Sequence, residues 1–338
     1  MMDLRSIRRP FHLILDWDGT LTKKDTLHLV GLIGYQHKER QHQSSPVTPW
    51  QDIVNAYILD FSSHQSQYSP KPAERRNLIQ ERAWLASLTP IENRSVQRVE
   101  KSGLFRGVRR SDVEQTAKQV VSDPKESERL QLRDGWRELF SRTCAVNASP
   151  GSGQSSISIL SVNWSEAFIR QSLLASLEQP SQDNGQHHDQ DELSEYIADL
   201  EIRANEISSL DEPNGSDGSL TKNNSAGIRT SADKLANMPP RLRNRLDSPS
   251  PKMEDTSAAP VIYVGDSSTD LECLLAADIG ICIRDLPMGS GQRELAETLE
   301  RLGIAVRRLG DSVDESEERR VVFWASGLRE IADALPKE

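Results

Sequence analysis

Short apolar runs that end abruptly in polar residues recur along this chain of 338 residues. Such runs predict buried strands, because a strand that is covered on both faces reads as a near-continuous hydrophobic stretch. We expect strands at 11–16, 157–164, 261–264, 279–283 and 305–309.

Between these runs, apolar residues recur at helical spacing. We expect helices at 50–59, 77–88, 111–121, 136–140, 166–177, 271–277 and 324–335. Strands that alternate with helices predict an α/β fold, a doubly wound parallel sheet of Rossmann-like type with helices on both faces. The segment 23–142 has several helical patterns and no clear strand, so it predicts a helical insertion after the first strand.

Three stretches are rich in Ser, Asn, Asp, Pro and Gly, namely 178–195, 208–227 and 239–258. Segments of this composition bury too little apolar surface to offset the entropy of ordering them. We therefore expect mobile surface insertions. The His187-His188-Asp189 triplet has metal-binding side chains, but within so polar a run a solvated loop is the favoured interpretation.

Composition narrows the functional classes. The formal net charge of -10 argues against a nucleic-acid or anionic-membrane surface. The cysteines Cys144, Cys273 and Cys282 have neither disulfide nor metal-ligand spacing, and the last two lie in apolar runs that predict core positions. No apolar stretch is long enough for a signal segment or a membrane span, so we expect a cytoplasmic protein. The sequence predicts no particular oligomeric state.

Candidate chemistry lies where three of the expected strands end. The first is followed by Asp16 and Asp18, the second contains Ser161, and the third is followed by Asp266 and Asp270. Taken singly, each is more often a turn or a helix cap. Parallel strands, however, place their carboxyl ends at one edge of the sheet, where ligands bind. Neighbouring carboxylates repel one another unless a cation lies between them, which indicates a metal site and chemistry on an anionic group.

These motifs together resemble the haloacid dehalogenase (HAD) superfamily. The first motif, Asp-x-Asp-x-Thr, is matched by residues 16–20, and the second, a Ser ending a strand, by Ser161. The acidic Gly-Asp-x-x-x-Asp motif is matched by residues 265–270. The motif lysine is best matched by Lys234.

Two other lysines compete for that position. Lys222 and Lys252 also precede the acidic motif, but both lie in more loop-like surroundings. The resemblance covers the segments 10–22, 155–177, 197–236 and 258–285.

The resemblance implies a phosphatase that works through an aspartyl-phosphate. Asp16 would be the nucleophile, and Asp18 would protonate the leaving oxygen and then deprotonate the attacking water. Mg²⁺, which prefers oxygen ligands, would be held by Asp16, the carbonyl of Asp18, and Asp266. Asp270 would bind the ion through water or orient the loop.

The same resemblance implies a phosphate cradle. It would consist of the Ser161 hydroxyl and backbone groups near Asn163, with Trp17 and Val162 beside them. Lys234 would pair with the nucleophile and with the phosphoryl charge. An acid at position 18 favours phosphatase or phosphotransferase chemistry over dehalogenase chemistry.

In this superfamily a long helical insertion after the first motif is a cap. The implied organisation is a core at 1–22, a phosphoserine-phosphatase-like helical cap at 23–142, and the rest of the core at 143–338. Four aromatic residues of the expected cap could stack on a substrate, although packing within the cap is the favoured interpretation: Trp50, Tyr57, Trp84 and Phe105.

Three strings, 160–165, 201–206 and 263–271, resemble the phosphatase domain of plant and fungal thiamine monophosphate phosphatase-like proteins. The implied partner is a small phosphorylated metabolite, with thiamine monophosphate as a candidate. Asn205, in the second string, either faces the site or is a simple strand or turn residue. Two alternatives remain: a catalytically degenerate binding or scaffold protein that docks through the polar insertions, and a phosphotransferase.

Overall fold

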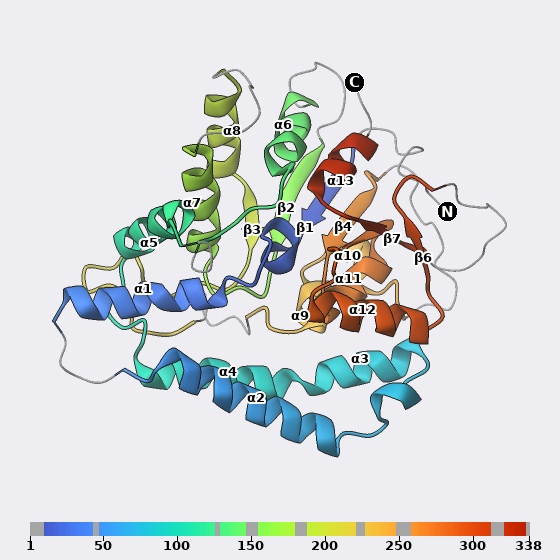
Figure 1. The fold of residues 1–338 in the computed structure, drawn as a ribbon, viewed down its shortest axis with the longest axis horizontal. Helices are drawn as coiled ribbons and strands as arrows, with labels where there is room; N and C mark the ends of the chain where they lie inside the picture. The colour runs from blue at the N-terminus through green and yellow to red at the C-terminus, as the bar shows by residue number, and fades with distance from the viewer. Residues whose placement is uncertain are drawn as a thin grey trace.

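A seven-stranded parallel sheet lies at the centre of the computed structural model (Figure 1). The structure describes residues 10–42, 47–125, 129–146, 155–179, 188–220, 227–247, 258–311 and 321–335. The strand order is β3-β2-β1-β4-β5-β7-β6, and every neighbouring pair is parallel. The strands are β1 (His12–Leu15), β2 (Ser156–Leu160), β3 (Glu201–Arg203), β4 (Val261–Gly265), β5 (Ile279–Ile283), β6 (Ala305–Arg308) and β7 (Val321–Ala325). The predicted α/β class with a parallel sheet is confirmed.

Helices surround the sheet and extend beyond one end of it (Figure 1). Those before β2 are α1 (Leu27–Arg40), α2 (Trp50–Gln67), α3 (Leu78–Ser87), α4 (Thr89–Ser102), α5 (Arg110–Ser122) and α6 (Trp136–Val146). Those between β2 and β4 are α7 (Glu166–Leu177), α8 (His188–Ala198), α9 (Ser231–Ala236) and α10 (Pro240–Arg243). The last three are α11 (Leu271–Ala276), α12 (Ser290–Arg301) and α13 (Leu328–Ala334).

Alternation along β1 divides the core into two layers. Successive strand side chains point to opposite faces. Leu13 and Leu15 accordingly join the apolar cluster beneath α6, α7, α8 and α13, whereas Ile14 joins the cluster beneath α9, α11 and α12. Because both faces are covered, all three side chains are buried, and the strand reads as the unbroken apolar run that predicted it.

Three strands differ from the sequence prediction. The strand expected at 157–164 is β2, which ends at Leu160, so Ser161 to Trp164 lie in the loop after it. Trp324 was expected in a helix, but it lies in β7, and the helix begins only at Leu328. The Val-Val-Phe-Trp-Ala segment has the β-branched and aromatic residues of a strand, and the helical pattern behind it concealed the boundary. The edge strand β3 was not predicted. It is three residues long and begins and ends with charged residues, so it has no apolar run.

The segment 23–142 supplies helices to two places. Helices α2, α3 and α4 form a layer beyond the end of the sheet (Figure 1), called here the α2–α4 layer. Helix α5 instead packs against α7, and α6 packs against β2 and α13. The second half of the predicted insertion therefore contributes to the layers that cover the sheet.

The three polar stretches are not uniformly loop. Helix α8 begins at His188, and α10 lies within the third stretch. In the second, Leu210 and Leu220 are buried, and Ser216 exchanges backbone hydrogen bonds with Gly107 and Val108. A few buried apolar side chains and backbone pairing thus connect the segment 208–220 to the loop before α5. Residues 180–187, 221–226 and 248–257 lie outside the described residues.

Two further expectations concern composition. Cys273 and Cys282 are buried free thiols, as predicted. Among the described residues, no helix combines the length and the apolar character needed to cross a bilayer. The side chains of the His187-His188-Asp189 triplet and of Cys144 lie outside the described part of the structure.

Candidate active site

The loop after β1 turns back sharply and meets the loop after β4. Asp16 directly follows β1, and its backbone N–H donates to the carbonyl of Val264 at 2.9 Å. Gly19 has a φ of +74°, and a Cβ at this position would lie 2.3 Å from Oδ2 of Asp266. The Thr20 hydroxyl donates to Oδ1 of Asp266 at 3.1 Å. The glycine thus permits a close approach that brings the first and last acidic motifs together.

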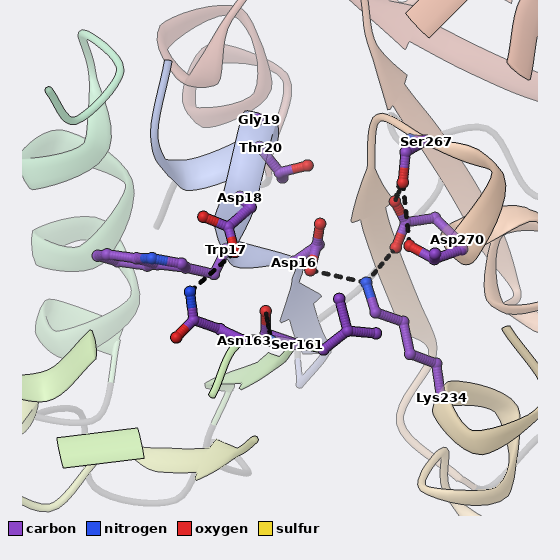
Figure 2. A network of polar contacts seen from close by, with 12 residues as sticks. Asp16, Trp17, Asp18, Gly19, Thr20, Ser161, Asn163, Lys234, Ser267 and Asp270 are labelled. Carbon is purple, nitrogen blue, oxygen red and sulfur yellow. Dashed lines mark hydrogen bonds and ion pairs between the residues drawn. The ribbon is translucent and has the colours of Figure 1, made fainter. Parts of the chain in front are cut away.

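Lys234 lies between two carboxylates at the centre of the site (Figure 2). Its Nζ donates to Oδ1 of Asp16 and to Oδ1 of Asp270, at 2.7 Å in each case. The side chain is fully buried, at 0% exposure. Helix α9 presents it, and Thr230 caps that helix by accepting from the N–H of Asp233. Burial alone would lower the pKa of Lys234, but the two carboxylates raise it above its usual range, so the ammonium stays charged.

Asp270 is satisfied by protein donors on both carboxylate oxygens. Oδ1 accepts from Lys234 and from the Tyr263 hydroxyl at 2.7 Å. Oδ2 accepts from the backbone N–H groups of Asp266 and Ser267, at 3.0 and 3.1 Å. These contacts fit the role of orienting the loop and Lys234, one of the two roles expected for Asp270.

Three carboxylates approach closely enough to hold a cation. Oxygens of Asp16, Asp266 and Asp270 lie within 4.8 Å of one another. Within the described part of the chain, no residue donates a hydrogen bond to the second oxygen of Asp16 or to Oδ2 of Asp266. Burial, followed by the charge of Asp270, raises the pKa of Asp266 to about 7. A hard cation with oxygen ligands fits this donor set and would offset the repulsion.

Asp18 is held by donors from two different segments. Its Oδ1 accepts from the backbone N–H of Thr26 at 2.7 Å and from the Thr26 hydroxyl at 2.6 Å. Its Oδ2 accepts from Nδ2 of Asn163 at 2.9 Å (Figure 2). Burial, followed by the charge of Asp25, raises the pKa of Asp18 to about 7. A carboxyl group in this environment can exchange a proton near neutral pH.

The predicted phosphate-binding residues reach the site in different ways. Ser161 is buried, and its hydroxyl accepts from the N–H of Asn163 at 3.1 Å, so that N–H already has a partner. Val162 lines the cavity described below. The Trp17 ring is buried and points away from Asp16, with Nε1 donating to the Thr26 hydroxyl at 3.0 Å. Only the backbone of Trp17 could therefore meet a phosphate. Lys222 lies outside the described residues, as does Lys252.

Asn205 joins the loop after β2 to the segment before α9. Its Nδ2 donates to the carbonyls of Val162, Asn163 and Ile228, and its Oδ1 accepts from the N–H of Ile228. The residue is buried and links two backbones instead of facing the site. This amide therefore helps to set where Lys234 lies relative to the loop at Ser161.

A cavity of about 630 Å³ opens above the carboxylates. Asp16, Asp18 and Asp266 line one part of it, while α2 and α4 supply Trp50 and Glu92 to another. Its size suits a small organic molecule. The α2–α4 layer thus shares one cavity with the strand-end carboxylates.

The aromatic residues considered from the sequence divide into two groups. Trp84 and Phe105 are buried in the core, as the favoured interpretation had it. Trp50 and Tyr57 line the cavity, and so does Trp164, which the sequence suggested only as a strand residue.

Thr26 and Arg133 are two further residues of the site that the sequence did not indicate. Thr26 stands just before a helical pattern and reads as an N-cap, but its hydroxyl bonds to Asp18. Arg133 contacts the backbone of the first motif, and no sequence signal indicates that contact.

Comparisons with known proteins give distant likenesses. No family model matches the chain. A Schizosaccharomyces pombe protein described as a CTO1 family protein is 26% identical over 274 residues, which are 80% of this chain and 81% of the relative.

Solved structures with a similar arrangement include two of phosphoserine phosphatase, one bound to substrate and one with an analogue of the phospho-aspartyl intermediate. Their TM-scores are 0.43 and 0.41 at 12% and 11% identity, each over 97% of this chain and 100% of the other. A HAD-family hydrolase from Salmonella enterica serovar Typhi has a TM-score of 0.38 at 15% identity, over 89% of this chain and 72% of the other. Because these TM-scores are below 0.5, they do not establish a family for the chain.

Proposed function

We propose that this chain is a Mg²⁺-dependent phosphatase that hydrolyses a small phosphomonoester through an aspartyl-phosphate on Asp16. The observation that carries the proposal is the placement of Asp16. One of its oxygens is held by the Lys234 ammonium at 2.7 Å, and the carboxylate opens into a cavity that Asp18 also lines. The motif resemblance to the HAD superfamily supports the same chemistry.

The chain's own residues divide the reaction into two steps. In the first, an oxygen of Asp16 attacks phosphorus, the ester P–O bond breaks, and Asp18 donates a proton to the leaving oxygen. In the second step, water attacks the phosphorus of the aspartyl-phosphate and gives a proton to Asp18. The bond between Asp16 and phosphorus breaks, so orthophosphate is released and Asp16 is regenerated. Thr26 and Asn163 hold Asp18 in place throughout.

Asp16, Asp266 and the backbone carbonyl of Asp18 would hold the metal ion. When bound, Mg²⁺ would supply positive charge that stabilises the phosphoryl oxygens. Lys234 contributes a second positive charge, fixed in place by Asp270. Ser161, at the end of β2, would offer its hydroxyl to a non-transferred oxygen.

Release of phosphate from a generic aryl phosphate tests the proposal. We expect turnover with Mg²⁺, loss of turnover after chelation, and recovery when Mg²⁺ is restored. Asp16→Asn should abolish turnover, whereas Asp199→Asn, at an exposed position, should match the native protein. Equal turnover by Asp16→Asn and the native protein would contradict the proposal. Product analysis with competing alcohols separates hydrolysis from phosphotransfer.

Thiamine monophosphate is our candidate for the substrate. The resemblance of three sequence strings to thiamine monophosphate phosphatase-like proteins supports it, as do the indole rings of Trp50 and Trp164 in the cavity. A panel of phosphorylated metabolites should give thiamine monophosphate the highest kcat/KM. A value no better than that of unrelated phosphates would exclude this substrate and leave the phosphatase proposal intact.

A further inference from the structure

Several of the residues that line the cavity are aromatic or aliphatic. Trp50 and Trp164 meet edge to face, with ring centroids 6.0 Å apart and planes at 68°. Ile53 and Val96 line the cavity beside them. Indole faces attract cations through their quadrupole as well as providing apolar contact. These side chains can therefore receive either a neutral ring or a positively charged group.

Glu92 introduces a carboxylate into the cavity lining. It lies in the first turn of α4, is half-buried, and lines the cavity. Its Oε1 accepts from the Tyr57 hydroxyl at 2.7 Å. Across the described residues, no Lys, Arg or His lies within ion-pair distance of this carboxylate. A half-buried acid whose direct partner is a neutral phenol favours a ligand that supplies positive charge.

Arg229 also lines the cavity, and its charge acts on Glu92. Its Nη1 donates to Oδ1 of Asn93, the neighbour of Glu92 on α4. Burial raises the pKa of Glu92, and the charge of Arg229 opposes that rise without a direct contact. Arg229 thus helps Glu92 stay ionised while leaving its carboxylate open to the cavity.

Besides the catalytic carboxylates and Glu92, the cavity lining carries Arg229, Asp285 and three charged residues in the loop after the first motif. Lys23, Lys24 and Asp25 line the cavity there, and Lys23 is paired with Asp134 at 3.5 Å. The α2–α4 layer itself contributes one charged group to the cavity lining, and that group is Glu92.

We infer that the α2–α4 layer selects phosphomonoesters whose organic part is positively charged, with Glu92 as the counter-charge and Trp50 and Trp164 as aromatic walls. The phosphate would lie at Asp16 and the cationic group at Glu92, within one cavity. This inference rests on the proposed phosphatase function and adds the substrate class to it.

Three para-substituted aryl phosphates whose substituents differ in charge test this selectivity. Para-ethylphenyl phosphate has a neutral organic part, O-phosphotyramine a cationic one, and the phosphate ester of phloretic acid an anionic one. We expect the native protein to favour O-phosphotyramine over the neutral ester by about tenfold or more in kcat/KM, the size of one charge-assisted contact. The anionic ester should be the poorest of the three.

Glu92→Gln tests the residue itself. It keeps the shape of the side chain and removes the charge, so the cationic-to-neutral ratio of kcat/KM should fall by about tenfold. Glu39→Gln, at an exposed position on α1, is the matched control and should keep the native ratio. Circular dichroism verifies that Glu92→Gln is folded. If Glu92→Gln does not fold, the ratios of kcat/KM that the native protein shows for the three esters decide whether the inference holds.

The outcomes separate the two proposals. Hydrolysis of all three esters at similar rates, a preference for the anionic ester, or an unchanged ratio in folded Glu92→Gln overturns the inference and leaves the phosphatase function standing. Failure of the native protein to hydrolyse any of the three with Mg²⁺ overturns the proposed function, and the selectivity falls with it.

Discussion

Arg133 donates from Nη2 to the carbonyl oxygen of Gly19 at 2.7 Å, and thereby holds the turn that follows the candidate nucleophile. The same guanidinium forms a two-point contact with Asp285, at 2.5 and 2.8 Å, in the loop after β5. Gln292 donates to Asp285 in turn, at 2.8 Å. Because Arg133 is only 5% exposed, it connects the two active-site loops from a buried position.

Removing Arg133 should destabilise the fold. Arg133→Ala leaves the Gly19 carbonyl and the Asp285 carboxylate without their donor, and we expect the free energy of unfolding to fall by about 2 kcal/mol. Urea denaturation measures the change. Arg308→Ala removes an exposed pair with Glu330 and should cost less than about 1 kcal/mol. Equal losses in the two variants would contradict the role given to Arg133.

Lys234 should be required for catalysis. Lys234→Met leaves Asp16 and Asp270 without their shared ammonium, so charge that develops on the phosphoryl group loses a stabilising partner. We expect kcat to fall by about 100-fold, as when a positioned electrostatic group is removed. Steady-state hydrolysis of an aryl phosphate measures this. Lys118→Met, at an exposed position of α5, is the control, and a similar kcat in both variants would count against Lys234.

Gly265→Ala should disturb the acidic loop. A Cβ at this position would lie 2.4 Å from Cγ of Asp270, so the carboxylate that holds Lys234 must move. We expect a loss of about 1 to 3 kcal/mol in stability, typical of overpacking, together with lower activity. Gly327→Ala is the matched control, since its added Cβ would have no neighbour within 4 Å. Native-like Tm and kcat in Gly265→Ala would show that the loop adapts without cost.

Thr26 should act as a positioning residue for Asp18. Thr26→Val removes the hydroxyl that donates to Oδ1 of Asp18 at 2.6 Å while preserving the size of the side chain. We expect kcat to fall by about tenfold with little change in KM, because proton transfer depends on where Asp18 lies. Thr26→Ser keeps the hydroxyl and should restore kcat. A rise in KM at constant kcat would point instead to substrate binding.

Local patterns predicted the central sheet well and its margins poorly. The runs that form β1, β4 and β5 are buried on both faces of the sheet. Each run is therefore apolar along its length and can be recognised from its own residues. The strand β3 has a single buried residue, Ile202, and its pairing comes from β2. The polar stretch 208–220 likewise pairs with the loop before α5, and no pattern within the stretch predicts that contact.

The sequence by itself determined which carboxylates are candidates for chemistry. Asp16, Asp18 and Asp266 follow apolar strands directly, and parallel strands must bring such residues to one edge. Only the tertiary structure decided which lysine reaches Asp16, that Thr26 and Asn163 hold Asp18, and that Glu92 lines the same cavity. The physical reason is separation along the sequence. The burial of a strand and the presence of a carboxylate at its end can both be recognised from a few neighbouring residues. A hydrogen bond or a cavity wall depends on segments that folding brings together, and no local pattern encodes that distance.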